Sequence, residues 1–262
     1  MTADLNPSAY DAFAPFYDAF TAASDYQTWA EETLALAARH GLTGDALLDL
    51  ACGTGKSFEP FMRRGFRVTG CDASAAMLAE AAIKLPDAKL LRCDIRELPV
   101  LGSFDLVTCF DDSLNYLSSD DELAAAFAGM ARNMRAGGLA MFDLNSLLAY
   151  RSTFAVDSVS EHDGMVFAWR GLGDAGAEPG CAAEAQIDVF FARGDGAYER
   201  VLTRHRQRHF ERARVLELLA GAGLDCVAVH GVLGDVSLDD IADEERHLKV
   251  LYMARRAEGG DF

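Results

Sequence analysis

The stretch that decides the fold is residues 47–55, which read Leu47-Leu48-Asp49-Leu50-Ala51-Cys52-Gly53-Thr54-Gly55. An apolar run is followed by a glycine-rich turn and then by an amphipathic segment, which is the order of a buried strand, a tight turn and a helix. Glycine permits backbone conformations and close ligand approach that a Cβ atom would prevent. Such a turn also exposes backbone N–H groups at the start of a helix. The stretch therefore predicts a ligand-binding loop.

The same alternation of strand and helix continues on both sides of this loop. We expect strands at 46–50, 68–71, 89–93, 106–110 and 139–144, and helices at 8–39, 56–64, 74–84 and 120–135. A helix at 211–219 and strands at 224–230 and 247–255 follow later in the chain. Alternation of this length predicts βαβ units and a mostly parallel sheet.

The alternation is interrupted between residues 151 and 210. This segment has β-like runs at 165–170, 184–191 and 199–210, separated by glycine-rich stretches. We therefore expect three parts, which are a helical N-terminal segment at 1–40, a discontinuous α/β domain at 41–150 and 211–262, and a small antiparallel insert at 151–210.

Charge and cysteine content exclude several classes of function. The chain has 41 acidic and 24 basic residues and a net charge of −17, which would repel nucleic acid and anionic membranes. It has no apolar stretch long enough to span a bilayer. The six cysteines form no C-x-x-C pair, which predicts a reducing cytoplasm without disulfides, and no residues have metal-ligand spacing.

Spacing distinguishes the ligands that could use the glycine-rich loop. A phosphate-binding P-loop needs glycine five positions before Gly55, where the chain has Leu50. A dinucleotide loop needs a small residue at position 58, where the chain has Phe58. Asp49 would also repel a pyrophosphate, whereas its carboxylate suits a ligand with an ammonium group. Both phosphate interpretations therefore fail.

Two further acids follow the loop in register at successive strand ends. Asp72 ends the second strand, 19 residues after Gly53, where an acid suits the hydroxyls of a ribose. The third strand ends at Cys93-Asp94-Ile95. Together with Asp49-x-Ala51-x-Gly53-x-Gly55, this pattern resembles the class I S-adenosylmethionine-dependent methyltransferases. The turn Arg135-Ala136-Gly137-Gly138 is a variant of the Lys-Pro-Gly-Gly turn of that family.

The resemblance implies a Rossmann-like seven-stranded sheet with helices on both faces, a helical lid at the N-terminus and an insert on the substrate side. It implies S-adenosylmethionine as the cofactor, S-adenosylhomocysteine as the product, and no metal. In this family the acid at the third strand contacts the adenine amino group and its neighbour covers the ring. The expected cofactor-binding residues are Tyr17, Asp49, Ala51, Gly53, Gly55, Asp72, Ala73, Met77, Asp94, Ile95 and Phe110.

The segment Tyr10-Asp11-Ala12-Phe13-Ala14-Pro15-Phe16-Tyr17-Asp18 resembles the lid helix of bacterial small-molecule methyltransferases. By that resemblance Tyr17 reaches the methionine end of the cofactor, and Tyr10 lies on the same helix face. Both are candidates for catalysis. The alternative is that the two rings only pack an amphipathic helix.

Two other catalytic candidates lie on the acceptor side. Asp112 follows the fourth strand and could hold a cationic amine or accept its proton, or it could belong to a polar turn. His205 could act as a general base, or it could be a structural residue on a sheet face. Alternation in the last strand of the insert places His205 on one face with Thr203, Gln207 and His209, and Arg200, Arg204, Arg206 and Arg208 on the other. These arginines could bind an anionic substrate, although pairing with Glu184 and Asp188 is the favoured interpretation.

We therefore expect methyl transfer to a small-molecule acceptor, with an amine of an amino sugar or antibiotic intermediate preferred over a hydroxyl. A protein or RNA methyltransferase is the first rival, but the segment Asp111-Asp112-Ser113-Leu114 lacks the Asn-Pro-Pro-Tyr-type motif for such nitrogen acceptors. A non-catalytic module that binds S-adenosylmethionine is the second. The oligomeric state, a homo-oligomer included, stays open.

Overall fold

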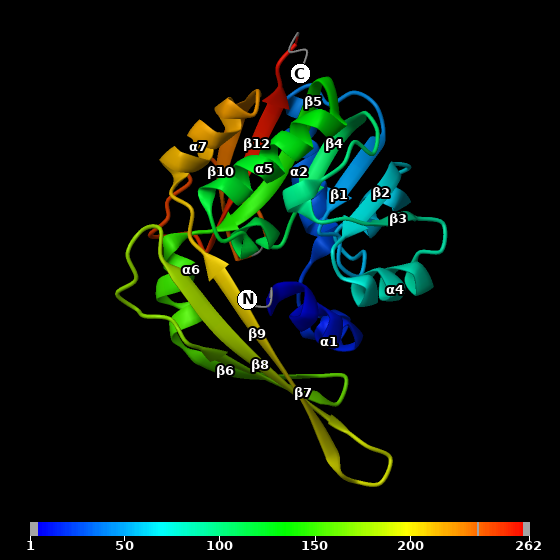
Figure 1. Ribbon diagram of the computed structural model, residues 1–262, viewed down its shortest axis with the longest axis vertical. Helices are drawn as coiled ribbons and strands as arrows, with labels where there is room; N and C mark the ends of the chain where they lie inside the picture. The colour runs from blue at the N-terminus through cyan, green and yellow to red at the C-terminus, as the bar shows by residue number, and fades with distance from the viewer. Residues whose placement is uncertain (1–4, 235, 259–262) are drawn as a thin grey trace.

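The main sheet is mixed and carries the glycine-rich loop at its centre. The computed structural model describes residues 5–234 and 236–258. The strands run in the order β11-β10-β12-β5-β4-β1-β2-β3, with parallel pairing from β3 to β5 and antiparallel pairing from β5 onward (Figure 1). Their bounds are β1 Ala46–Leu50, β2 Arg67–Asp72, β3 Lys89–Arg92, β4 Phe104–Cys109, β5 Met134–Asn145, β10 Leu224–Val232, β11 Leu238–Asp239 and β12 Lys249–Arg256. The predicted fold class is confirmed, and the two-residue β11 adds an edge to the expected seven strands.

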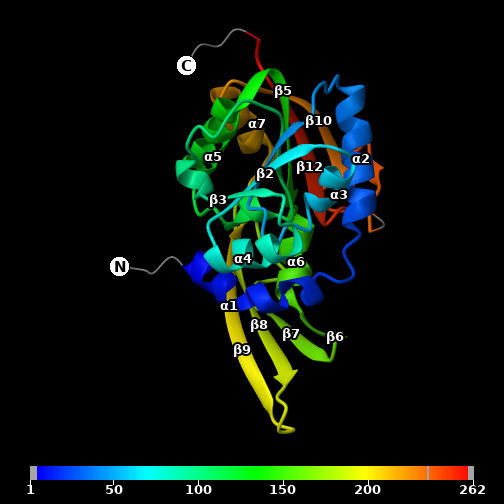
Figure 2. The ribbon, with the colours of Figure 1, turned by 90° about the vertical axis from the view of Figure 1, so that its right-hand side faces the viewer.

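Helices cover both faces of this sheet, as Figure 2 shows. Helices α5 (Asp120–Asn133) and α7 (Arg212–Gly221) lie on one face, and α2 (Tyr26–Arg39) and α3 (Glu59–Arg63) lie on the other. Helix α4 (Ala75–Lys84) follows β2. One apolar cluster contains Phe127, Phe142 and Tyr252, and the cluster on the other face contains Trp29 and Phe61. Burial on both faces explains why the central strands read as continuous apolar runs.

A second, antiparallel sheet forms the insert. Its strands are β6 (Asp157–His162), β7 (Met165–Gly171), β8 (Ala182–Ala192) and β9 (Tyr198–Arg208), in that order across the sheet. Two short helices, α6 (Leu147–Arg151) and η3 (Thr153–Ala155), lead into it. Strand β6 was not predicted, because five of its six residues are exposed and its sequence lacks apolar alternation. It is an edge strand held by pairing with β7.

The predicted N-terminal helix is two helices, because α1 (Leu5–Phe20) ends before the turn that leads to α2. Helix α1 lies between the insert and the carboxyl end of the main sheet (Figures 1 and 2). Phe16 and Phe20 contact Phe191 and Phe167 of the insert, with ring centroids 5.0 and 5.6 Å apart. The aromatic stripe of α1 therefore joins this helix to the insert sheet.

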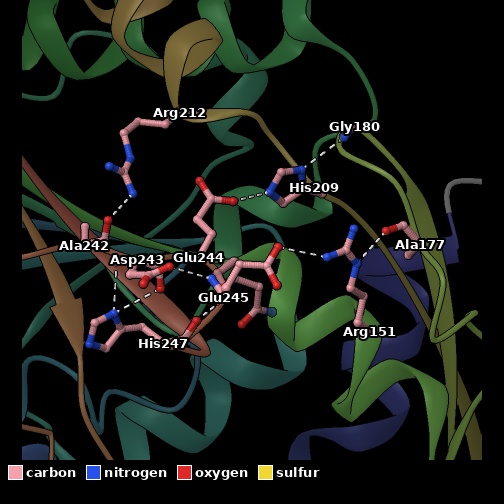
Figure 3. Close-up of polar contacts among 12 residues, drawn as sticks. Arg151, Ala177, Gly180, His209, Arg212, Ala242, Asp243, Glu244, Glu245 and His247 are labelled. Atoms are coloured by element: carbon pink, nitrogen blue, oxygen red, sulfur yellow. Dashed lines mark hydrogen bonds and ion pairs between the residues drawn. The ribbon is translucent and has the colours of Figure 1, made fainter.

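Polar contacts join the insert to the loop before β12 (Figure 3). The ring of His209 accepts a hydrogen bond from the N–H of Gly180 at Nδ1 and contacts Glu244 at 2.8 Å through Nε2. Arg151 binds the carboxylate of Glu245 at 2.9 Å and donates to the carbonyl of Ala177. His209 is 2% exposed and its two ring nitrogens are both engaged, so it has a structural role.

The turn after β1 provides a test of how tightly this fold is packed. Gly55 has φ +87°, and a Cβ atom there would lie 2.7 Å from Leu85 Cδ1. Gly65 has φ +90°, with nothing within 4 Å of such an atom. We expect Gly65→Ala to lower the free energy of unfolding by about 1 kcal/mol, the cost of left-handed backbone. Gly55→Ala should lower the free energy of unfolding by a further amount of about 1–3 kcal/mol, because the added Cβ atom would overlap with Leu85.

Urea denaturation of the two variants, compared with the unsubstituted protein, measures this difference. Equal losses in the two variants would contradict the packing around Gly55, since the backbone angle of the two glycines is nearly the same.

Candidate functional site

A pocket lies at the carboxyl ends of β1 to β4, where α1 covers it. The space that it encloses is about 870 Å³ when its open mouth is counted. The residues expected at the site that do line this pocket are Tyr10, Tyr17, Ala51, Gly53, Asp72, Ala73, Met77, Asp94 and Ile95. The strand order explains their convergence, because ligands bind outside the carboxyl ends of strands where the order reverses.

Asp72 connects the loop after β1 to the loop after β2. Its carboxylate accepts hydrogen bonds of 2.8 Å from the N–H groups of Gly53 and Ser74, one on each oxygen. Burial raises the pKa of Asp72, although these two hydrogen bonds act in the opposite direction. Each carboxylate oxygen can accept more than one hydrogen bond. Asp72 therefore fixes both loops and can still accept from a ligand.

The backbone of the first loop bends sharply toward the pocket. Ala51 and Gly53 have φ of +52° and +53°, and the left-handed conformation is unusual for alanine. A Cβ atom on Gly53 would lie 3.9 Å from the ring of Tyr17. The glycine thus stands between the loop and the lid helix, in the space that a ligand would use.

Asp94 lies at the far end of the pocket and is held by its neighbour. The carboxylate pairs with the guanidinium of Arg96 at 2.6 Å and accepts from the Arg96 N–H at 2.9 Å. The hydrogen bond from the Arg96 side chain lowers the pKa of Asp94. Asp94 is therefore an anion at neutral pH, and Ile95 and Met77 provide apolar surface beside it.

Three of the expected cofactor-binding residues do not line the pocket, and neither do the catalytic candidates Asp112 and His205. Asp49 is 1% exposed and lies beneath the loop, where it accepts hydrogen bonds from Ser57 Oγ at 2.7 Å and Thr108 Oγ1 at 2.5 Å. Gly55 packs against the side chains of Leu85 and Phe58. Phe110 packs against Trp29, with ring centroids 5.3 Å apart. These residues support the loop from below, away from the ligand side.

The lid helix α1 is attached to the loops by its acidic residues. Asp18 accepts from Thr54 Oγ1 at 2.6 Å and binds Lys84 of α4 at 2.5 Å. Asp11 accepts from Ser74 Oγ at 2.5 Å. The helix thereby holds Tyr10 and Tyr17 over the pocket, and burial raises the pKa of both phenols.

An acidic cluster follows β4 and includes residues that sequence reasoning missed. Asp111 and Asp112 both have left-handed backbone, at φ +59° and +49°, a strain that is common at functional sites. The ammonium of Lys249 lies 2.7 Å from Asp112 and 3.1 Å from Asp143, and Tyr26 donates to Asp111 at 2.7 Å. Burial lowers the pKa of Lys249, but the carboxylates outweigh it and the net shift is upward.

Asp143 and Lys249 were missed because they come from β5 and β12, far apart in the chain. The available signal was a charged residue inside an apolar strand run, since such a residue needs a partner when it is buried. Burial raises the pKa of Asp143 to about 6, even though Lys249 acts to lower it. Asp111 lines the pocket, so the cluster gives that wall a negative potential.

The two faces of β9 separate as alternation predicts. His205 is 3% exposed and its Nδ1 lies 3.0 Å from the hydroxyl of Tyr116, a pocket residue in the segment after β4. On the outer face, Arg200 binds Asp188 at 2.6 Å and Arg208 binds Asp120 at 2.9 Å. The favoured interpretation of pairing is thus supported for Asp188, while no ion pair is seen for Glu184 within the described residues.

Comparison with known proteins shows which proteins this chain resembles. A family described as "Methyltransferase domain" matches residues 47–138. A protein of Geobacillus sp. (strain WCH70) whose name describes it as a methyltransferase is 29% identical over 94% of this chain and 99% of its own length. The dTDP-3-amino-3,4,6-trideoxy-alpha-D-glucopyranose N,N-dimethyltransferase of Streptomyces venezuelae is 33% identical, over 50% of this chain and 56% of its own.

Two solved structures share the fold over nearly the whole chain. An S-adenosylmethionine-dependent methyltransferase from Clostridium acetobutylicum ATCC 824 has a TM-score of 0.79 and 25% identity, covering 95% of this chain and 99% of its own. The sugar N-methyltransferase KedS8 from Streptoalloteichus sp ATCC 53650 has a TM-score of 0.74 and 25% identity, covering 92% and 93%. The predicted resemblance is confirmed: residues 47–138 match the methyltransferase-domain family, and the fold of nearly the whole chain is similar to that of an S-adenosylmethionine-dependent methyltransferase.

The buried carboxylate of Asp49 predicts a pH dependence of stability. Burial raises its pKa from the ordinary 3.8 to about 7 in the folded protein, although the hydroxyls of Thr108 and Ser57 act to lower it. A raised folded-state pKa favours the folded protein at low pH, and this contribution is lost as the pH rises from 3.8 to about 7. Asp49→Asn removes the ionisation. We therefore expect its free energy of unfolding to rise, relative to the unsubstituted protein, by up to about 1.4 kcal/mol per pH unit in that window.

Chemical denaturation of both proteins at several pH values from about 4.5 to about 7.5 measures how the difference in their free energies of unfolding changes with pH. A difference that stays constant, or that changes in the opposite direction, would contradict the burial of an ionisable Asp49.

Proposed function

We propose that the protein transfers a methyl group from S-adenosylmethionine to an amine of a small molecule. The observation that carries the proposal is the convergence of the Gly53 loop, Asp72 and Tyr17 on one pocket under a helical lid. The full-length likeness to S-adenosylmethionine-dependent methyltransferases supports the same conclusion.

The residues of the pocket fit each part of this cofactor. Each carboxylate oxygen of Asp72 already accepts one hydrogen bond and has a further lone pair, and these two lone pairs suit two ribose hydroxyls. The loop at Gly53 leaves room for the methionine part of the cofactor, which bears the sulfonium. Asp94 suits the adenine amino group, with Ile95 and Met77 against the ring. The acidic cluster beside Asp111 suits the cationic end of an amino acid.

When bound, the sulfonium supplies a methyl group that is already activated for in-line displacement. The task of the chain is then to align the acceptor with that methyl group and to exclude water. Helix α1 closes the pocket and holds Tyr17 and Tyr10 on its acceptor side. The neutral amine attacks with its lone pair and becomes positively charged as the sulfonium becomes a neutral thioether, and the carboxylates of Asp111 and Asp112 would stabilise that developing charge.

An amine acceptor is supported by two observations of different kind. The pocket wall is acidic, which favours a group that becomes a cation on methylation over one that stays neutral. KedS8, a sugar N-methyltransferase, shares the fold through the insert as well as the cofactor domain. We propose an amino sugar or a similar antibiotic-type amine as the acceptor class.

The three parts of the chain have different roles in this proposal. We propose that residues 1–40 form the lid, that 41–150 and 211–262 bind the cofactor, and that 151–210 contribute the acceptor side. All six cysteines are free thiols, which supports a reducing compartment such as the cytoplasm. Over residues 5–234 and 236–258, none of the helices combines the length and apolar character needed to cross a bilayer.

Asp72→Ala tests the cofactor site. We expect it to weaken S-adenosylhomocysteine binding about 10- to 100-fold, because it removes the acceptor for ribose hydroxyls and releases Gly53. Isothermal titration calorimetry measures the affinity, with the exposed Asp87→Ala as the control variant. If Asp72→Ala bound S-adenosylhomocysteine as tightly as the control, the proposed function would fall.

A matched pair of acceptors tests the choice of nitrogen. The probes are dTDP-3-amino-3,4,6-trideoxy-glucose and the sugar nucleotide that carries a hydroxyl at the same carbon. We expect turnover to S-adenosylhomocysteine with the amine and at least about 100-fold less with the alcohol, because a neutral hydroxyl is the weaker nucleophile and needs a base. Equal turnover would contradict the amine preference, and mass spectrometry of the product identifies the methylated atom.

A further inference from the structure

The inner face of β9 is polar, buried and not yet assigned a role. Thr203, His205 and Gln207 are each 3% exposed. Buried polar groups cost free energy unless they are hydrogen-bonded, so their partners show what this face does. The strand passes beside α1 (Figure 1), and the ring of His205 lies 5.2 Å from the ring of Tyr10. The network therefore reaches the pocket through the lid.

The direction of the hydrogen bonds is fixed at Asp112. A carboxylate only accepts, so the amide nitrogen of Gln207, 2.5 Å away, must face it. The amide oxygen of Gln207 then accepts from Asn145 Nδ2 at 2.8 Å. Gln207 also gives a hydrogen bond to Tyr116, which lowers the pKa of that phenol against the larger, opposite effect of burial. The oxygen of Tyr116 is thus an acceptor for Gln207.

The same oxygen also accepts from the hydroxyl of Tyr10, at 2.9 Å. A phenol has one proton to donate, and that of Tyr116 is directed to His205 Nδ1 at 3.0 Å. With Tyr10 as the donor to Tyr116, an unprotonated Nδ1 completes the arrangement by accepting from Tyr116. The proton of the neutral ring lies on Nε2, which is 3.0 Å from Thr203 Oγ1. The network is consistent with one tautomer of His205.

This direction determines what Tyr10 offers to the pocket that it lines. Its proton is directed to Tyr116, so its lone pairs are left for a ligand. Tyr17 has a parallel arrangement, because its hydroxyl hydrogen-bonds to Tyr26, which donates to Asp111. Both lid tyrosines therefore present an oxygen that accepts. An amine brings N–H donors, and this match fits the acceptor class.

We propose that Tyr10 accepts a hydrogen bond from the N–H of the acceptor amine, and that His205 is a positioning residue that fixes this polarity through Tyr116. The proposal depends on the proposed function for the identity of the acceptor, but not for the direction of the network. Burial lowers the pKa of His205 to about 4, although Asp112 acts to raise it. A ring with so low a pKa is neutral at physiological pH and only a weak base, which agrees with a positioning role.

Nitrogen NMR of the full-length protein tests the network without any acceptor. The sample is the ¹⁵N-histidine-labelled protein bound to S-adenosylhomocysteine, and the His205 signals are assigned from their loss in His205→Asn. We expect a neutral ring protonated at Nε2 at pH 7. We also expect Tyr116→Phe to remove the bias toward this tautomer, because the donor to Nδ1 is gone. A ring protonated at Nδ1, or an imidazolium, would overturn the proposal.

Methyl transfer to dTDP-3-amino-3,4,6-trideoxy-glucose tests the role in turnover. We expect Tyr10→Phe and His205→Ala each to lower kcat/KM about 10-fold, the effect of one hydrogen bond to a group that gains charge. His205→Asn should retain activity within about 3-fold, since the asparagine oxygen can accept from Tyr116 as Nδ1 does. Tyr198→Phe, at a tyrosine of β9 that is 66% exposed, is the matched control.

The outcomes separate this proposal from the proposed function. If His205→Asn were as impaired as His205→Ala, proton transfer at the imidazole would be required and the positioning role would be wrong. S-adenosylhomocysteine affinity within about 2-fold of the unsubstituted protein shows that each variant is folded. If no amine were turned over at all, the proposed function would fall, while the NMR result would still decide the direction of the network.

Discussion

The hydrogen bonds that Asp72 accepts from Gly53 and Ser74 are the constraint on which the site depends. They join the loops of two adjacent strands, so the pocket floor exists only when both strands are in register. The lid is seated on the same two loops, because its acids bind Thr54 and Ser74. One carboxylate thus determines both the floor of the pocket and the place of its cover, and a ligand bound to Asp72 is automatically beneath the tyrosines of α1.

Around this floor the protein buries more negative than positive charge. The ammonium of Lys249 lies within 4 Å of Asp111, Asp112 and Asp143, and burial raises the pKa of Asp49, Asp72 and Asp143. Unbalanced buried acids are unfavourable, and such clusters are typical of functional sites. A cationic cofactor and an acceptor that becomes cationic would both relieve this imbalance. The electrostatics of the site are therefore complementary to the occupied state.

The sequence was sufficient for what lies close together along the chain. The loop at 47–55, Asp72 and Asp94 follow successive strands, so register alone brings them to one edge of the sheet, and the pocket contains all three elements. It was insufficient for Asp143 and Lys249, because they meet only when β5 and β12 are packed beside the segment after β4. Asp49 shows a different limit, since its position in the motif was right but pleating directs its side chain beneath the loop. Strand β6 has no apolar pattern, and only its neighbour β7 defines it.

Strand β9 shows how one element can serve stability and chemistry together. Its outer arginines bind Asp188 and Asp120, which ties the insert to itself and to α5. Its inner residues carry the hydrogen-bond direction from Asp112 to the lid. None of these inner residues lines the part of the pocket beside Asp72 and Asp94. Substitutions on the inner face of β9 therefore leave the contacts of Asp72 and Asp94 in place, so the two parts of the site can vary independently.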